Sequence, residues 1–391
     1  MSVRLAALGL MAVTALLGQD AALERVSLAS ARVREAAANL PEFADAPRKQ
    51  LTDLHLALRD WIESRLPKTK AELDAGLPLL QQSLTADLAR TGLLGGDDFK
   101  YGTIAEIKLS RPPEYPEALL AIASVGAGGG RDEAVYLYDW SDGNPVRKLE
   151  SIPDANVGVW AAIDFSTADD RGNRLAVVTR FCTHCEGCWS GMGYTLYRLG
   201  RGSAPGARLR SGDEFVYCYN YEIKMKPDDF LLEFPGFGID TNFLMRTHVL
   251  HYKVGEDGAV RIDPVAYEPR DFVDEWLTRP WDEMAGWSSA NAREELKKWH
   301  GVLHSDTVLG DFKFVQRCTQ KPGQWQIAVD LGWVAGKELP EPLRVYFLVQ
   351  QKGKDRFQMT GISFHRQSGC SSQASPSAQH PAPVGSQSGR R

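Results

Sequence analysis

The feature that most constrains this chain is a segment that recurs three times between residues 100 and 266. Its copies begin with similar apolar runs, EALLAIASVGAG, NRLAVVTRFCTH and DFLLEFPGFGID, in which Leu119, Leu175 and Leu231 are each 56 residues apart. An aromatic run follows each of them: AVYLYDW, GYTLYRL and HVLHYKV. A constant period of this length indicates one supersecondary unit that is copied along the chain.

Each copy has the composition of antiparallel strands. Short aromatic and β-branched runs alternate with clusters of Gly, Asp, Asn and Pro, which is typical of strands joined by turns. We therefore predict a three-unit antiparallel β-repeat domain over residues 100–266, with four strands in each unit. The strand YGTIAEIKLS precedes the first copy and is expected to complete the third unit and close a ring. Propellers usually have four to eight blades, so a propeller-like and a trefoil-like or prism-like domain are both open.

The segment before the repeat, residues 20–95, has helical periodicity. Leu51, Leu54 and Leu58 fall on one face of a first segment, and Leu73 begins the same spacing in a second. The run LPKTK separates the two and contains a proline, which ends helices. These patterns predict a helical hairpin whose apolar stripes pack on the main domain, with His55 at the edge of the packed face.

The two ends of the sequence have distinct compositions. Residues 1–19 combine Arg4 with an apolar run over residues 5–17 and then small and polar residues, which is typical of a signal peptide. The run is short for a membrane-spanning helix, so we expect a periplasmic or secreted protein with no transmembrane segment in the mature chain. Residues 371–391 are rich in Ser, Gln and Pro, and we predict a disordered tail there.

Residues 269–370 predict an α+β module. Helical patterns such as NAREELKKWHGVLH come first, and strand patterns such as GQWQIAVDLGW and LRVYFLVQQ follow. Cys318 and Cys370 flank these strands and are candidates for a disulfide that ties the end of the module to its sheet. The whole chain is therefore expected to be an α+β protein that is mainly β.

Three of the six cysteines, Cys182, Cys185 and Cys188, lie in the stretch RFCTHCEGCWSGMGY. In an oxidising compartment, disulfides suit this spacing best, with Cys182 bonded to Cys188 and Cys185 bonded to Cys218. The three clustered thiols are also an alternative metal site, although zinc sites commonly have four ligands. A redox-active pair is a third possibility. We expect no metal and no other cofactor.

Equivalent connections of a repeated unit emerge on one face, where binding residues accumulate. The connections between the first two strands of the three units therefore define a candidate binding face. Its members are Asp132, Glu133, His184, Glu186, Trp189, Phe237 and Asp240.

The sequence contains none of the usual catalytic motifs. No G-x-S-x-G, H-E-x-x-H or phosphate-binding loop is present, and no catalytic residue is assigned. The net charge is −5 with no basic run, which is unlike a nucleic-acid-binding protein. We expect an exported, non-catalytic protein that binds a protein or a glycan through the repeat domain. The alternative is an exported enzyme, either a hydrolase or a thiol- or metal-dependent oxidoreductase that uses the segment from Cys182 to Cys188.

Overall fold

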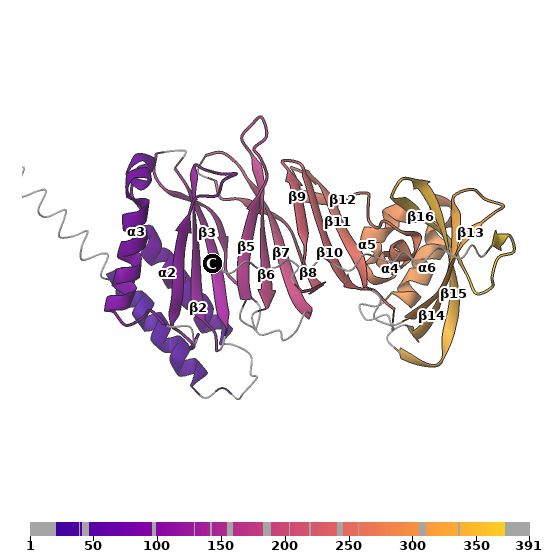
Figure 1. Cartoon of the computed structure of the whole chain (residues 1–391), viewed down its shortest axis with the longest axis horizontal. Helices are drawn as coiled ribbons and strands as arrows, with labels where there is room; N and C mark the ends of the chain where they lie inside the picture. The colour runs from indigo at the N-terminus through magenta and orange to yellow at the C-terminus, as the bar shows by residue number, and fades with distance from the viewer. Residues whose placement is uncertain are drawn as a thin grey trace, which may run out of the picture. The chain divides into compact units, whose positions relative to one another are not determined.

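We describe a computed structural model of the chain (Figure 1). The structure describes residues 21–38, 40, 47–95, 99–128, 130–140, 143–154, 159–182, 189–202, 204–218, 220–240, 245–256, 258–304, 310–334 and 337–371. The chain divides into two compact units. The first contains Met1–Gly236 and Leu250–Ile262, and the second contains Phe237–Val249 and Asp263–Arg391.

The predicted helical segment is confirmed in the first unit. A helix over residues 21–37 is followed by α2 (Arg48–Arg65) and α3 (Lys70–Arg90). Thr69 caps the N-terminus of α3 with a capping box. Its hydroxyl accepts from the backbone N–H of Glu72, and the Glu72 carboxylate accepts from the backbone N–H of Thr69. None of the described helices is both long enough and apolar enough to cross a bilayer.

Three four-stranded antiparallel sheets follow, and each uses four strands in their chain order. The first sheet contains β1 (Ile104–Ser110), β2 (Ala118–Gly126), β3 (Arg131–Asp139) and β4 (Val146–Ser151). The second contains β5 (Val159–Phe165), β6 (Arg174–Cys182), β7 (Trp189–Leu199) and β8 (Ala207–Tyr217). The third contains β9 (Glu222–Lys226), β10 (Asp229–Phe237), β11 (Met245–Gly255) and β12 (Gly258–Arg261).

The predicted grouping of strands is wrong by one strand. The strand YGTIAEIKLS contains β1, which pairs with β2 in the first sheet and does not complete the third (Ile107 opposite Ala123). Likewise β5 begins the second sheet and β9 begins the third. A repeating pattern defines a period but leaves open where the unit starts. The four-stranded units are present, whereas a propeller-like or trefoil-like repeat is not confirmed.

Alternating side chains explain how the first unit is layered. On β3, Tyr136 and Tyr138 face the helices, while Val135 and Leu137 face the second sheet. The other face of the second sheet packs on the third through residues such as Leu175, Val177, Phe230 and Leu232. Figure 1 shows α2 and α3 beside β2 and β3. Because helices cover the outer face of the first sheet, that face is not available to close a ring with the third.

The second unit has the predicted order of helices followed by strands. Its helices are α4 (Pro269–Thr278), α5 (Trp281–Met284) and α6 (Arg293–Leu303), with short 3₁₀ turns between the last two. Its antiparallel sheet has the order β16-β15-β14-β13-β17, formed by Arg356–Ser363, Lys337–Gly353, Gln324–Val334, Gly310–Cys318 and Cys370–Ser371. Trp276 of α4 is fully buried and packs edge-on against Phe347 of β15.

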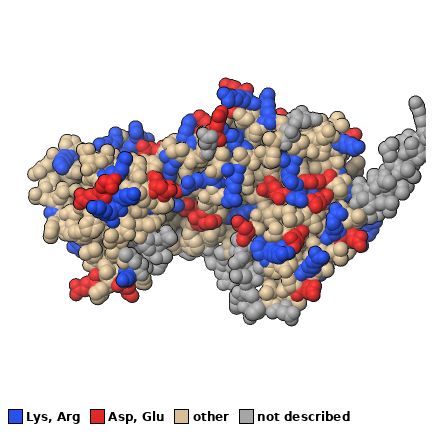
Figure 2. Space-filling view, turned by 180° about the vertical axis from the view of Figure 1, so that it is seen from behind, with Lys and Arg blue, Asp and Glu red and all other residues tan. Residues whose placement is uncertain are grey.

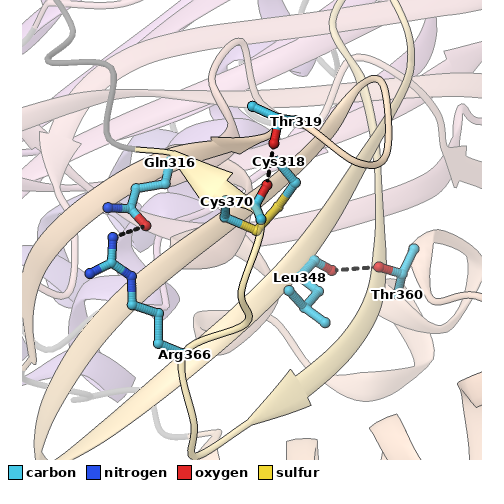
Figure 3. Close-up of a disulfide and its surroundings, with 8 residues drawn as sticks. Gln316, Cys318, Thr319, Leu348, Thr360, Arg366 and Cys370 are labelled. Carbon is cyan, nitrogen blue, oxygen red and sulfur yellow. Dashed lines mark hydrogen bonds between the residues drawn. A yellow bond between two sulfur atoms is a disulfide. The ribbon is translucent and has the colours of Figure 1, made fainter.

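The predicted disulfide between Cys318 and Cys370 is present in the second unit. It joins the end of β13 to β17 after a separation of 52 residues. Figure 3 shows the bond together with Arg366, whose guanidinium donates to the side-chain oxygen of Gln316 (3.0 Å). The segment after β16 is therefore attached to the sheet at two points.

Candidate functional site

The first predicted binding residue, Asp132, is fully buried inside the first unit. Its carboxylate accepts hydrogen bonds from two nitrogens of Arg48 at 2.8 and 3.1 Å, and lies 2.9 Å from Nε2 of His55. His55 is fully buried, so the prediction that it lies at the edge of the packed face is wrong. Burial raises the pKa of Asp132, but the hydrogen bonds and charges of His55 and Arg48 outweigh it and hold the pKa below its usual value. The carboxylate thus joins α2 to β3 and is not accessible to a ligand in this conformation.

Glu133 is also buried, and both of its carboxylate oxygens have hydrogen-bond partners. One carboxylate oxygen accepts from the backbone N–H of Ala161 (2.8 Å), and the other lies 3.2 Å from the hydroxyl of Ser124. These contacts connect the first sheet to the first strand of the second. The side chain of Glu133 therefore holds two sheets together.

The other predicted binding residues are divided among different parts of the chain. Phe237 and Asp240 belong to the second unit, and a carboxylate oxygen of Asp240 accepts from the backbone N–H of Phe312 (3.2 Å). His184 and Glu186 lie outside the described residues, and Trp189 is described only as the first residue of β7. The shared binding face stays a prediction.

Two cysteines of the first unit, Cys182 at the end of β6 and Cys218 after β8, are disulfide-bonded. Cys185 and Cys188 lie outside the described residues, so the predicted pairing stays a prediction. A cysteine sulfur in a disulfide is not a thiolate that can bind zinc, which weighs against the alternative metal site. Within the described ranges, no group of three His, Cys, Asp or Glu residues is placed to hold a metal ion.

A pocket of about 380 Å³ lies in the first unit, on the face of the second sheet that packs on the first. We call it the glycine pocket, because Gly191 and Gly193 of β7 form its floor. Its walls are residues 150–154 at the end of β4 and the β8 residues 208–214. Cys182 and Gly191, which flank the predicted cysteine loop, both line it.

The floor is open because two glycines leave one face of β7 without side chains. Residues two apart in a strand face the same side, so Gly191 and Gly193 leave adjacent gaps on one face. A Cβ atom on Gly191 would meet nothing within 4 Å, whereas one on Gly193 would lie 3.1 Å from a carboxylate oxygen of Asp213. The pocket is therefore a gap in the side-chain layer above β7.

Arg180 of β6 lines the glycine pocket beside Gly193. One terminal nitrogen donates to the backbone oxygen of Glu133 (2.7 Å), and the other donates to the backbone and hydroxyl oxygens of Ser151 (2.6 and 2.9 Å). Burial lowers the pKa of Arg180, and the nearby charges of Asp132, Asp154 and Glu133 oppose this effect. Arg180 remains charged at neutral pH and ties the second sheet to the first.

Polar groups of both signs line the rest of the glycine pocket. Glu150 pairs with Arg59 (2.9 Å), and Arg208 donates to the hydroxyl of Ser211 (2.7 Å). By contrast, the carboxylates of Asp154 and Asp213 are exposed and make no hydrogen bond or ion pair within the described residues. These two carboxylates are available to a ligand.

The glycine pocket is not predicted from the sequence. One signal was present, because Gly191 and Gly193 occur two residues apart in a strand of mainly aromatic and apolar residues. Glycine in a strand often marks a close approach of another group. The wall from β4 could not be paired with β8 without the tertiary structure. Of the predicted binding residues, Glu133 is connected to this pocket through its backbone oxygen.

Comparison with known proteins adds no family. A scan of the chain against protein-family models finds no match, and a search of the curated proteins finds none either. Function must therefore be inferred from the chemistry and geometry of the site itself.

Proposed function

We propose that the chain is an exported, non-catalytic binding protein that holds a polar ligand, or one end of a larger ligand, in the glycine pocket. The observation that supports this most is an open glycine floor beside two carboxylates, Asp154 and Asp213, that have no partner within the described residues. Concave sites with a few convergent polar groups are where proteins commonly bind small molecules. The repeated four-stranded unit would then serve as a rigid support for this site.

The hydrogen bonds of the pocket favour binding over catalysis. Its hydroxyls at Ser151 and Ser211 accept hydrogen bonds from arginines, and the hydroxyl of Ser211 also lies 3.4 Å from that of Thr195. An activated nucleophile needs a general base as its partner. A guanidinium only donates, so it cannot remove the hydroxyl proton.

We also propose a periplasmic or secreted location. The signal-peptide pattern of residues 1–19 supports it, as do the disulfide of Cys318 with Cys370 and the bonded state of Cys182 and Cys218. The charges on the visible face of Figure 2 are of mixed sign, which gives no support to a nucleic-acid partner. N-terminal sequencing of the exported protein should find residues 1–19 removed.

The binding proposal can be tested by filling the pocket. Gly191→Val should be tolerated by the fold, because a Cβ there meets nothing within 4 Å and valine suits a strand. The matched control is Gly76→Ala, a half-buried site in α3 where a Cβ also meets nothing within 4 Å. Saturation-transfer NMR would use a mixture of cellobiose, diacetylchitobiose, glycylglycine, citrate and putrescine.

We expect a signal from at least one probe, its loss in Gly191→Val and its retention in Gly76→Ala. Equal binding by both variants, or no binding of any probe, would contradict the proposal. Conversion of a bound probe into a product over hours would instead support the enzyme alternative.

A further inference from the structure

We infer that the ligand of the glycine pocket is a neutral carbohydrate; this rests on the proposed function and names the chemical class of its ligand. A sugar has hydroxyl groups that both donate and accept hydrogen bonds along its polar edge, and it has apolar C–H faces. The pocket presents partners for each of these features.

The donor on the floor is Arg180. A guanidinium has five N–H donors, and the three hydrogen bonds to Glu133 and Ser151 leave two of them for another acceptor. Because the three bonds hold the guanidinium in place, its remaining donors are oriented before a ligand binds. Such an arrangement lowers the entropy lost on binding.

The acceptors are Asp213 and Asp154, on opposite walls. Arg180, Gly193 and Asp213 occupy one row across β6, β7 and β8, so that the glycine separates a donor from an acceptor. Asp154 lies on the wall that continues from β4. A sugar hydroxyl placed above Gly193 could accept from the guanidinium and donate to the Asp213 carboxylate.

The balance of charge favours a neutral ligand. Asp154 and Asp213, which make no ion pair within the described residues, are balanced by the guanidinium groups of Arg180 and Arg208, whose described partners are neutral oxygens. A strongly anionic ligand would be attracted by the two arginines but repelled by the two aspartates. A strongly cationic ligand would meet the reverse. Hydroxyl groups can satisfy both signs.

The floor also argues against an extended peptide. Peptides that bind sheets commonly add a strand at an open edge. Here β7 is an inner strand, because Gly193 pairs with Arg180 on one side and Asp213 on the other. The backbone groups of β7 are already used, so a ligand on this floor is bound by side chains.

An aromatic ring extends the site along β8. Phe215 lies two residues after Asp213, on the same face of the strand, and pairs with Gly191 across the sheet. Its side chain is 53% exposed. A large exposed ring next to hydrogen-bonding groups suits a pyranose, whose C–H face is apolar while its edge is polar.

Calorimetric titration of the full chain tests the inference. The neutral probes are cellohexaose, maltohexaose and N-acetylchitohexaose, and the charged comparators are hexagalacturonate and tetralysine. We expect at least one neutral probe to bind, with less than about a twofold change in affinity when salt is raised, because screening acts on charged ligands.

Asp213→Asn should weaken that binding about 10- to 100-fold, because a hydrogen bond to a charged acceptor becomes one to a neutral acceptor. The matched control is Asp170→Asn, which alters another exposed and unpaired carboxylate of the first unit outside the pocket and should leave affinity unchanged. Gly191→Val should abolish binding.

The outcomes separate this inference from the function on which it rests. Binding of a charged comparator alone, lost in Gly191→Val and sensitive to salt, would overturn the carbohydrate class while the pocket remained a binding site. Neutral-sugar binding that survives both Gly191→Val and Asp213→Asn would place the sugar elsewhere and overturn the inference. No binding of any hexasaccharide, tetralysine or member of the NMR mixture would overturn both.

Discussion

Asp132 is a single residue whose buried charge is stabilised by two charged or polar partners. The carboxylate is fully buried, and it depends on Arg48 and His55 of α2. Removing one member of a buried ion pair usually costs more than the pair contributes, because the other member stays buried without its partner. Asp132 is therefore a structural residue whose loss should be measurable.

We expect Asp132→Asn to lower the free energy of unfolding by about 3–5 kcal/mol at neutral pH. Urea unfolding followed by tryptophan fluorescence measures this. The control is Asp53→Asn, which removes an exposed pair with Lys49 (3.1 Å) and should cost about 0.5 kcal/mol or less.

The difference between the wild type and Asp132→Asn should also depend on pH. The pKa of Asp132 is lower in the folded chain than its ordinary value of 3.8, so the unfolded chain takes up this proton first. The contribution of the carboxylate is then fully present above pH 3.8 and is lost as pH falls through the lower, folded pKa. A difference that stays constant from neutral pH into strong acid would contradict this assignment.

At the element scale, the short strand β17 depends on its attachments. Two residue pairs join it to β13, and the disulfide between Cys318 and Cys370 coincides with one of them (Figure 3). The backbone oxygen of Gly369 accepts from both the N–H (2.7 Å) and the hydroxyl (2.8 Å) of Thr319. So few hydrogen bonds would not hold an isolated strand, and the covalent bond supplies the rest.

Replacing Cys318 and Cys370 together by serine should lower the free energy of unfolding by about 2–4 kcal/mol, because the unfolded chain gains the freedom of a long loop. Urea unfolding under non-reducing conditions measures it. A chain shortened to end at residue 371 is the control, and we expect its Tm to be unchanged because residues 372–391 contain few large apolar side chains. A Tm lower by several degrees for the shortened chain would contradict the predicted disordered tail.

For the molecule as a whole, each of the two units is built from two separate segments of the chain. Phe237–Val249 contains the last residue of β10 and the first part of β11, but it belongs to the second unit. Arg246 in this segment is buried and contacts Asp274 (2.9 Å) and Glu275 (2.6 Å) of α4. Gly238 is needed there, because a Cβ atom would lie 2.1 Å from a carboxylate oxygen of Asp274. The second unit is therefore incomplete without residues 237–249.

A fragment of residues 237–371 should unfold cooperatively, whereas residues 263–371 alone should not. Without Arg246, the carboxylate of Asp274 loses the cation 2.9 Å away, and Glu275 loses one of the two arginines that it contacts among the described residues. Urea unfolding of both fragments, followed by tryptophan fluorescence, compares them. Equal cooperative transitions would mean that the second unit begins at residue 263 and does not need residues 237–249.

Helices and strands could largely be predicted from local pattern. Leu51, Leu54 and Leu58 repeat with the helical period and are all buried, and β2 and β3 coincide with two of the repeated runs. The disulfide of Cys318 with Cys370 was also predicted, because the flanking strands suggested that the two ends meet. These features depend on residues close in sequence or on a simple sheet order.

The candidate site could not be predicted in the same way. Asp132 and Glu133 were assigned to an exposed face because they follow a glycine-rich turn, but their partners Arg48 and Ala161 come from other elements. The spacing of charged residues in a sequence does not show which of them will be paired and buried. Among the described residues of the pocket, Asp154 and Asp213 are carboxylates with no hydrogen bond or ion pair, and no pattern in the sequence marks them.

By itself, the sequence determined the helical segment, the succession of four-stranded antiparallel units and the helices-then-strands order of the second unit. Each follows from hydrophobic periods of 3.6 or 2 residues and from turn residues, which act over a few positions. Tertiary structure decided that β1 starts the first sheet, that helices cover the outer face of that sheet and that residues 237–249 complete the second unit. It also brought β4 beside β8 to form the glycine pocket. These outcomes depend on which apolar faces and buried charges find partners far away in the chain, and no local period records that choice.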